Sequence, residues 1–198
     1  MSWITPVTLC GRVARLEPLE AAHEAGLSAA VQDGELWKLW YTTIPDASGM
    51  AAEIQRRLDL QAQGSMLPFT VRRADTGEIV GMTTYMNIDQ RYKRVEIGST
   101  WYARGAQGTA LNTECKRMLL AHAFDTLGCI AVEFRTHYFN TASRRAIERV
   151  GAKLDGILRN HSRMADGTLR DTCVYSVIES EWPTVRSHLD WQLAKPRG

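Results

Sequence analysis

A strand, a long helix and a second strand follow one another around residues 95–138, and this succession constrains the fold more than any other feature. The first strand reads RVEIGSTWYA (94–103), the helix TALNTECKRMLLAHAFDTLG (109–128) and the second strand CIAVEFRTHYF (129–139). Gly128 marks the end of the helix. Two strands joined through such a helix run parallel in one sheet, because the chain has to return to the edge where it began. We therefore expect one parallel strand pair.

The flanking segments predict antiparallel hairpins and further helices. Strands are expected at 8–19, 67–73, 79–88, 152–164 and 168–180, and helices at 20–32, 49–64, 140–151 and 181–194. Ser48 and Asn140 are the expected caps of two helices, and Gly151 is the expected end of the second. The fold class is therefore α/β, an α+β mixed sheet that is mostly antiparallel and is flanked by helices in one domain.

The composition excludes several classes of protein. A chain of 198 residues with 44% hydrophobic residues can bury a substantial core, while a net charge of +2 is too small to indicate a nucleic acid or a membrane as partner. No apolar run is long enough to span a bilayer, and the first residues lack the pattern of a signal peptide, so a cytoplasmic location is expected. The four cysteines and five histidines show no metal-ligand spacing, and no metal is expected.

Small residues gather where the first strand of the parallel pair passes into the helix. Residues 107–113, QGTALNT, stand at a helix N-terminus, where unpaired N–H groups attract anions. The segment is either a phosphate or pyrophosphate cradle or a loop trimmed for close packing. A Walker loop and a G-x-G-x-x-G fingerprint are both absent, which disfavours nucleoside-triphosphate and NAD enzymes.

Four segments, in order, resemble the GNAT acyltransferases (Gcn5-related N-acetyltransferases). WYARGAQGTALNTECKRMLLAHAF resembles their motif A, and NTASRRAIERVGAKLDGILRNH resembles the motif that follows it. VRRADTGEIVGMTTYMNI and DGTLRDTCVYSVIESEWP are similar to the central and final hairpins of the RimJ/RimL-like branch. The resemblance covers about residues 9–183 and implies a GNAT fold with a splayed parallel strand pair. It implies a single acyltransferase domain over residues 1–183, with 184–198 as a helical extension or tail.

The resemblance implies acetyl-CoA, or coenzyme A, as the cofactor and no metal. The main chain of the first parallel strand would face the pantetheine arm, and the small-residue loop would receive the pyrophosphate, with Gln107 in the first motif position. Ala110 and Asn112 stand where glycine-type residues are usual. Arg145, with Arg144 beside it, would reach the 3′-phosphate, unless both only decorate a solvated helix face. The implied cofactor-binding residues are Ser99, Thr100, Trp101, Tyr102, Gln107, Gly108, Thr109, Ala110, Leu111, Asn112, Thr113, Asn140, Ser143 and Arg145.

Glu96 is the candidate catalytic base, because some members of the family carry a carboxylate a few residues before the pantetheine contacts. Strand alternation places Glu96, Gly98 and Thr100 on one face of the sheet. If that face meets the substrate cleft, Glu96 takes the proton of the amine directly or through water. The alternative is a solvated carboxylate that pairs with Arg94 or Lys93.

The candidate acid is Ser143. Many GNAT enzymes carry a tyrosine four residues before the glycine of this motif, and here that position is Ile147, which has no proton to give. Ser143 lies one turn after Asn140 on the same helix face and could protonate the leaving thiolate, with water as the alternative. The resemblance also implies that Asn140 bonds the pantetheine amides in addition to its role as a cap.

Trp37, Trp40 and Tyr41 stand between the first two helices, at the place of the substrate-side loop of the family, and are expected to bind the acceptor. Packing in the core is the alternative. The predicted function is that of an enzyme, a GNAT-type N-acetyltransferase that moves an acetyl group from acetyl-CoA to an amine by direct attack. The amine belongs to a small molecule or a protein N-terminus, and a homodimer is left open. The alternative is a non-catalytic acyl-CoA-binding protein on the same fold.

Overall fold

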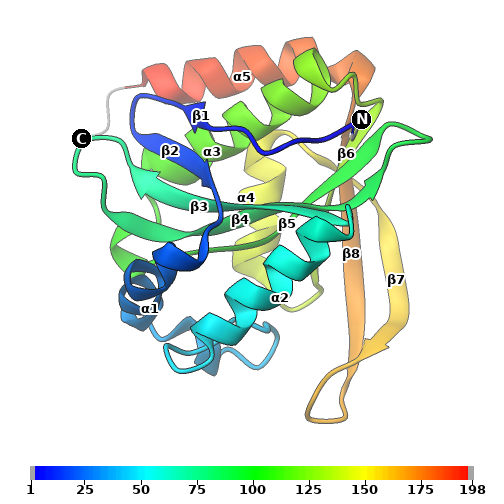
Figure 1. Ribbon diagram of the computed structural model, residues 1–198. Helices are drawn as coiled ribbons and strands as arrows, with labels where there is room; N and C mark the ends of the chain where they lie inside the picture. Colours follow the sequence, from blue (N-terminus) through cyan, green and yellow to red (C-terminus); the bar gives the residue numbers. More distant parts are fainter. Residues whose placement is uncertain (1–2, 196–198) are drawn as a thin grey trace.

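Across residues 3–195, the part of the chain that the computed structural model describes, eight strands form one mixed sheet (Figure 1). The strand order is β1-β2-β3-β4-β5-β6-β8-β7. Neighbouring strands are antiparallel except for β5 and β6, so the predicted mixed sheet with one parallel pair is confirmed. The strands are β1 (Leu9–Cys10), β2 (Ala14–Pro18), β3 (Met66–Arg73), β4 (Ile79–Asp89), β5 (Arg94–Tyr102), β6 (Ala131–His137), β7 (Lys153–Arg163) and β8 (Leu169–Ile178).

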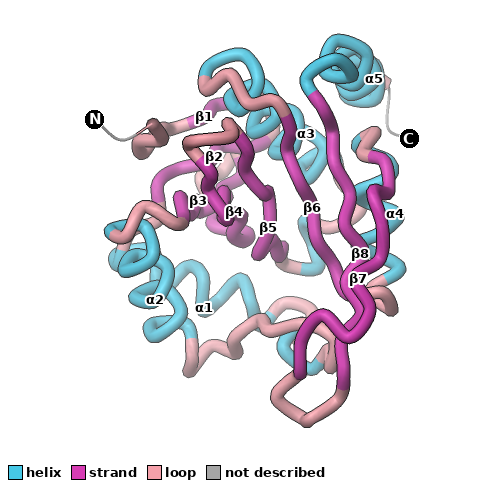
Figure 2. The backbone as a smooth tube through the Cα atoms, turned by 90° about the vertical axis from the view of Figure 1, so that its right-hand side faces the viewer, coloured by secondary structure: helices cyan, strands magenta, loops and turns pink. Residues whose placement is uncertain are grey.

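Helices cover both faces of this sheet (Figure 2). The α-helices are α1 (Glu24–Gln32), α2 (Met50–Ala62), α3 (Ala110–Ala121), α4 (Thr141–Val150) and α5 (Trp182–Ala194). The first two helices, α1 and α2, pack on one face, which we call the α2 face. The other three, α3, α4 and α5, pack on the opposite face, which we call the α3 face. Each face has its own apolar core. Shorter 3-10 turns lie at Ala21–His23, Leu36–Lys38, Arg104–Ala106 and Glu179–Glu181, and a π-helical turn at His122–Thr126 continues α3.

The parallel strands β5 and β6 pair over only three residues each. Arg94–Glu96 lies beside Ala131–Glu133, and within the described residues the two strands pair no further, although β5 runs on to Tyr102. β6, in contrast, pairs with β8 along all seven of its residues. We call the place where β5 and β6 part the fork. The main chain of β5 beyond Glu96 therefore turns an unpaired edge toward the fork.

A β-bulge interrupts β5 inside the fork. Ser99 and Thr100 together oppose Thr83 of β4, where a regular ladder would place one residue. Ser99 has a φ of 48°, in the left-handed region that residues with a side chain rarely occupy. Such a bulge adds one residue to a strand and bends it locally.

The bulge also changes which side chains share a face. Thr100 lies on the α3 face, where its hydroxyl is 3.0 Å from the amine of Lys116. Glu96 and Gly98 remain on the α2 face. The expectation that Glu96, Gly98 and Thr100 share one face is therefore wrong, because the extra residue reverses the alternation after Gly98.

The segment expected to form one strand at 8–19 is a tight hairpin of β1 and β2. The turn between them is held by the buried carboxylate of Glu114 on α3, which accepts the backbone N–H groups of Arg12, Val13 and Ala14 at 3.0, 2.7 and 2.8 Å. These three N–H groups point at a side chain about a hundred residues away. They therefore cannot serve a continuous β ladder.

One of the two predicted helix caps is confirmed. Asn140 caps α4, since its Oδ1 accepts the N–H of Ser143 at 3.0 Å, and Gly151 ends this helix with a φ of 103°. Ser48 does not cap α2. Its hydroxyl donates to the carboxylate of Asp46, which also accepts the N–H of Gly49 and so organises the turn before the helix.

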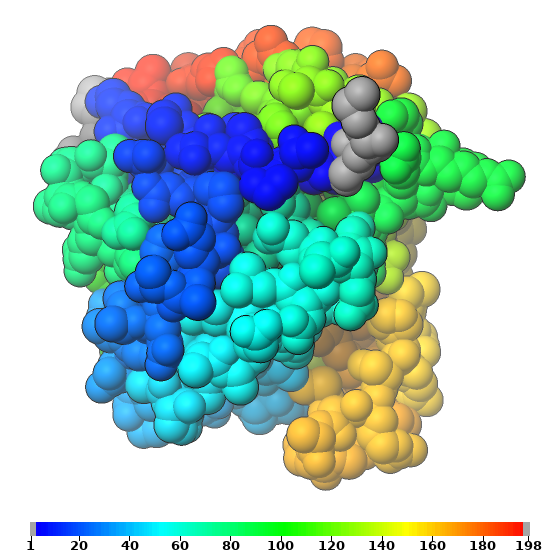
Figure 3. Space-filling model, viewed as in Figure 1, coloured from blue at the N-terminus to red at the C-terminus, as the bar shows by residue number. Residues whose placement is uncertain are grey.

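The last hairpin and the last helix of the described chain differ in how closely they join the core. The β7–β8 hairpin protrudes beyond the rest of the molecule (Figure 3). α5 instead packs on α3, with Leu189 fully buried and Arg117 paired with Asp190. Residues 196–198 of the expected extension at 184–198 lie outside the described residues, and the domain boundary at residue 183 stays a prediction.

Candidate active site

The loop before α3 leaves open space in front of a helix N-terminus. Thr109 caps α3 by accepting the N–H of Leu111 at 3.2 Å. Gly108 has a φ of 72°, and a Cβ placed on it would meet no atom within 4 Å. Glycine is therefore favoured here by the left-handed backbone conformation and not by a lack of space for a side chain. Gln107 is exposed, and its side-chain amide donates to the carbonyl of Tyr102 at 2.9 Å.

The predicted cofactor-binding residues of β5 and of the start of α3 fall into two groups. The side chains of Trp101, Tyr102, Leu111 and Thr113 are buried, so that only their main chain can meet a ligand. The remaining residues, Ser99, Thr100, 107–110 and Asn112, are exposed or half-buried. A free strand edge followed by an open helix N-terminus fits coenzyme A, because the edge can pair with amides and the helix end attracts a pyrophosphate.

The N-terminus of α4 lies beyond the end of β6. The side-chain oxygen of Asn140 accepts the capping hydrogen bond of this helix. Ser143 is half-buried and lies in the first turn of the helix. Ile147 is buried in the core of the α3 face, with an exposed fraction of 8%. The position at which many family members carry a tyrosine is therefore a packing position in this chain.

The two arginines of α4 have different surroundings. Arg144 is engaged by the protein itself: its Nε donates to the hydroxyl of Tyr175 at 3.1 Å and its guanidinium lies over the ring of Tyr138. Arg145 is exposed, and its Nε reaches the carbonyl of Thr141 at 3.4 Å. Of the two, Arg145 has the guanidinium that a phosphate could approach from solvent.

Glu96 lies buried at the base of the fork, as the last residue of β5 that pairs with β6. Its exposed fraction is 5%. The side-chain amide of Asn87 donates to its Oε2 at 2.7 Å, and Nε of Arg135 lies 3.5 Å from the same oxygen. Arg94 pairs with Glu133 instead. The alternative of a solvated Glu96 paired with Arg94 is therefore wrong.

Burial raises the pKa of the Glu96 carboxyl, and the hydrogen bond from Asn87 and the charge of Arg135 offset part of this effect. A carboxylate with a raised pKa accepts a proton near neutral pH more readily than an exposed one. Gly98 makes room for this group, since a Cβ there would lie 2.8 Å from its Oε1. The arrangement can therefore hold an ionisable carboxyl group next to the unpaired edge of β5.

An aromatic cluster stands at the far end of β6. Trp40 packs edge-on against Tyr41 and His137, with ring centroids 5.5 and 5.1 Å apart, and lies 6.0 Å from Phe139. Trp40 and Phe139 are 53% and 62% exposed. Sequence reasoning found Trp40 and Tyr41 but missed His137 and Phe139. The aromatic run directly after a predicted strand was the signal that could have found them.

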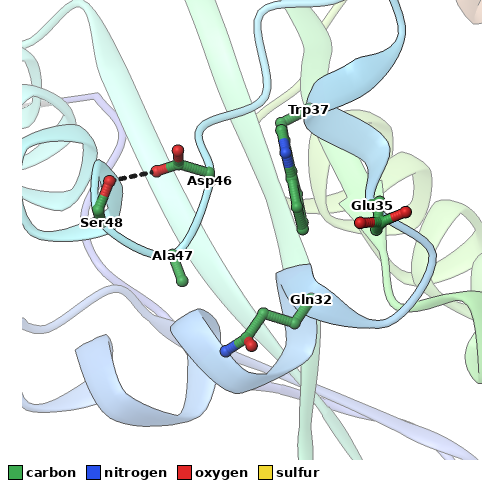
Figure 4. A pocket seen from close by; sticks show the side chains of 6 residues that line it. All are labelled: Gln32, Glu35, Trp37, Asp46, Ala47 and Ser48. Carbon is green, nitrogen blue, oxygen red and sulfur yellow. Dashed lines mark hydrogen bonds between the residues drawn. The ribbon is translucent and has the colours of Figure 1, made fainter.

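Trp37 lies apart from this cluster. It lines a shallow depression of about 350 Å³ between α1 and the start of α2 (Figure 4). Gln32, Glu35, Asp46, Ala47 and Ser48 complete the lining. The structure therefore separates the three predicted acceptor-binding residues into a pair beside β6 and a third residue elsewhere.

Within residues 3–195, the His, Cys, Asp and Glu side chains form no group of three or more that could hold a metal ion. Over the same residues, no helix has both the length and the apolar character required to cross a lipid bilayer.

Known proteins share both the sequence pattern and the fold. Residues 14–153 match the family described as Acetyltransferase (GNAT) domain. A protein of Bacillus subtilis, provisionally named ribosomal N-acetyltransferase YdaF, is 31% identical over 106 residues, which cover 54% of this chain and 57% of that protein.

Solved structures agree with this match. A GCN5-related N-acetyltransferase from Brucella melitensis has a TM-score of 0.86 and 30% identity over 96% of this chain and 87% of its own. RimJ of Mycobacterium smegmatis, solved in complex with CoA-disulfide, has a TM-score of 0.80 and 22% identity over 94% and 95%, which shows the shared fold. The chain therefore belongs to the GNAT family, and it is an acetyltransferase that takes its acetyl group from acetyl-CoA and passes it to an amine.

Proposed function

We propose that this acetyltransferase acts on the α-amino group of a protein N-terminus, and that Glu96 receives the proton that the amine gives up. The observation that carries the proposal is the buried Glu96 carboxyl group at the base of the fork, with its raised pKa. It lies beside the only stretch of β5 whose main chain is free to meet a ligand among the described residues.

The reaction forms an N–C bond, breaks a C–S bond and moves two protons. Acetyl-CoA supplies the thioester, whose sulfur leaves as a thiolate. Glu96 starts as a carboxylate, accepts the amine proton directly or through water, and later releases it to solvent. The thiolate takes its proton from Ser143 or from water. A thiol with a pKa of about 8.5 leaves without a strong acid, so that a serine or water is enough.

We assign the cofactor to the fork and to the loop before α3. The main chain of 99–102 would pair with the amides of the pantetheine arm, and the N–H groups of 107–113 would receive the pyrophosphate. Asn140 would bond the pantetheine, and Arg145 would reach the 3′-phosphate. The exposed guanidinium of Arg145 and the open space in front of Gly108 support this assignment.

The acceptor site favours a peptide over a small amine. The aromatic cluster beside β6 is open to solvent at Trp40 and Phe139, and such an open rim suits an extended chain better than a compact molecule. The name of one similar protein, a ribosomal N-acetyltransferase of Bacillus subtilis, supports a protein as the acceptor.

An acceptor screen tests this proposal. Free thiol release from acetyl-CoA would be followed with a short peptide that has a free N-terminus. The matched control is the same peptide with its N-terminus blocked and an internal lysine added, and a polyamine represents small amines. We expect thiol release with the first peptide alone. Release with the blocked peptide or with the polyamine, and none with the free N-terminus, would contradict the proposed acceptor.

A further inference from the structure

Two buried cations meet the β5 bulge from opposite faces of the sheet. Arg57 of α2 has an exposed fraction of 3%, and Lys116 of α3 has one of 7%. Ser99 and Thr100, the two residues of the bulge, are among the hydrogen-bond partners of these cations. These side-chain contacts play no part in the backbone hydrogen bonding of α2 or α3.

Arg57 holds the main chain of the bulge. Both terminal nitrogens of its guanidinium donate to the carbonyl oxygen of Ser99, at 3.3 and 3.2 Å. One of them also donates to the hydroxyl of Thr84 at 2.7 Å, and Nε donates to Glu53 at 2.7 Å. The guanidinium is thus fixed by two side chains, those of Thr84 and Glu53, while it holds the carbonyl of Ser99.

Lys116 holds the other residue of the bulge. Its amine donates to the hydroxyl of Thr100 at 3.0 Å and to that of Thr83 at 3.4 Å, and these two hydroxyls lie 2.8 Å apart. In the described part of the chain no carboxylate pairs with this amine, which also lies 6.0 Å from the centre of the Phe134 ring. Burial lowers the pKa of Lys116 to about 8.

Packing alone does not explain a lysine at this place. A buried ammonium group without a carboxylate costs stability, while methionine fills a similar volume without that cost. A charge kept at such a position indicates a use that the fold itself does not require. The fork is the nearest candidate for such a use, since Thr100 lies on β5, which borders the fork, and Thr83 lies beside it on β4.

We propose that Arg57 and Lys116 are positioning residues for acetyl transfer, which clamp the β5 bulge from both faces and so fix the direction of the peptide that joins Ser99 to Thr100. In a planar trans peptide the N–H points opposite to the C=O. With the Ser99 carbonyl held by Arg57, the N–H of Thr100 is directed away from α2. The guanidinium also polarises this peptide and strengthens its N–H as a donor.

A fixed N–H donor at the edge of the fork suits acyl transfer, because such donors stabilise the negative charge that develops on the carbonyl oxygen. The inference rests on the fork as the acetyl-CoA site, as proposed above. The inference explains why β5 contains a bulge and why a buried cation contacts it on each face of the sheet. Loosening either contact should therefore slow the chemistry more than it weakens the binding of coenzyme A.

The test compares two variants with two matched controls. Lys116→Met and Arg57→Met each remove one clamp. Arg117→Met removes the next cation of the same helix, which pairs with Asp190, and Arg56→Met removes the neighbour of Arg57 that shares Glu53 without touching the bulge. Thermal unfolding, calorimetric titration with CoA and turnover with a good acceptor are measured for all four. The amide resonance of Thr100 is recorded by NMR in the protein without acetyl-CoA.

We expect turnover of both clamp variants to fall by roughly tenfold or more, with the CoA dissociation constant within about twofold of wild type. The Thr100 amide resonance should move in both clamp variants and stay in place in both controls. The melting temperature of Lys116→Met should not fall, a result that a purely structural lysine would not give. If Arg57→Met does not fold, Lys116→Met carries the test.

Turnover of Lys116→Met equal to that of Arg117→Met, or an unmoved Thr100 amide, would overturn the inference. If the fork is not the acetyl-CoA site, the measurements would give a different result. In that case wild type itself would bind no CoA at the fork, while the NMR comparison without ligand would still report whether the two cations fix the bulge.

Discussion

Two buried glutamates of this chain have nearly equal burial and opposite surroundings. Glu96 and Glu114 have exposed fractions of 5% and 8%, and each lies against a glycine. A Cβ on Gly98 would come within 2.8 Å of Glu96, and a Cβ on Gly11 within 2.3 Å of Glu114. Glu114 accepts three backbone N–H groups. Glu96 accepts one side-chain amide and has an arginine at 3.5 Å.

The difference separates two kinds of buried carboxylate. A buried carboxylate whose oxygens are filled by backbone donors is fixed in charge and place, and it stabilises the turn it closes. A buried carboxylate with few donors keeps the capacity to exchange a proton. On this basis Glu114 is a structural group that ties the β1–β2 turn to α3, and the surroundings of Glu96 fit the catalytic role that we propose for it.

The largest effect should come from Glu114→Ala. Three buried N–H groups would lose a charged acceptor, and we expect the free energy of unfolding to fall by about 4 kcal/mol. Urea denaturation followed by circular dichroism measures this. Glu35→Ala, at an exposed carboxylate, is the control and should change stability little. A loss below about 1 kcal/mol would mean that water replaces the carboxylate at the turn.

Glu96→Gln should give the reverse pattern. The variant keeps the shape of the side chain and a partner for Asn87 but cannot accept the amine proton, so turnover should drop by roughly 10²-fold. The melting temperature and the affinity for CoA should hardly change. Unaltered turnover with a good acceptor would show that Glu96 is as structural as Glu114.

The pH dependence sharpens the same contrast. Glu96 has to be ionised to accept a proton, and burial raises its pKa above the ordinary value of a glutamate. Protonation of the acceptor amine lowers kcat/KM of both enzymes as the pH falls. Below the raised pKa of Glu96, kcat/KM of wild type should fall by about a further tenfold for each pH unit, and Glu96→Gln should lack this additional fall. Profiles of the same slope in wild type and variant would show that Glu96 does not titrate in the reaction.

The two glycines provide the smallest and most specific effects. Gly98→Ala should move a loosely held carboxylate, so that turnover falls about tenfold with little change in stability. Gly11→Ala presses on a carboxylate fixed by three hydrogen bonds, so stability should fall by about 1–2 kcal/mol with turnover unchanged. Turnover and urea denaturation of both variants test this crossed pattern. If both variants lose only stability, the contrast between the two glutamates does not hold.

Local patterns predicted most of the fold. The strand–helix–strand succession predicted the parallel β5–β6 pair, and Asn140 and Gly151 predicted both ends of α4, because these signals act within a few residues of the chain. Contacts between distant segments were not predicted. Glu114 breaks the first expected strand from about a hundred residues away. The role of Asp46 in the turn before α2 is a local feature that was also missed, because Ser48 and Asp46 are both residue types that organise helix starts.

The candidate site was predicted in part for the same reason. Glu96 could be chosen from its place in the strand, but its burial depends on Gly98 and on the partners Asn87 and Arg135. The bulge was not predicted, because Ser99 is an ordinary residue with no sign of a left-handed φ. Without the bulge, nothing in the sequence could bring Lys116 to Thr100.

The short ladder between β5 and β6 has a consequence for heat stability. It leaves the sheet as two halves, β1 to β5 and β6 to β8, which are joined by three residue pairs and by the helices that pack on them. A ligand that lies in the fork bridges both halves and binds only the folded chain. Mass action then adds about 2.7 kcal/mol to the free energy of unfolding when the ligand is at a hundred times its dissociation constant. The lifetime of this enzyme in a cell is thereby tied to the supply of its own acetyl donor.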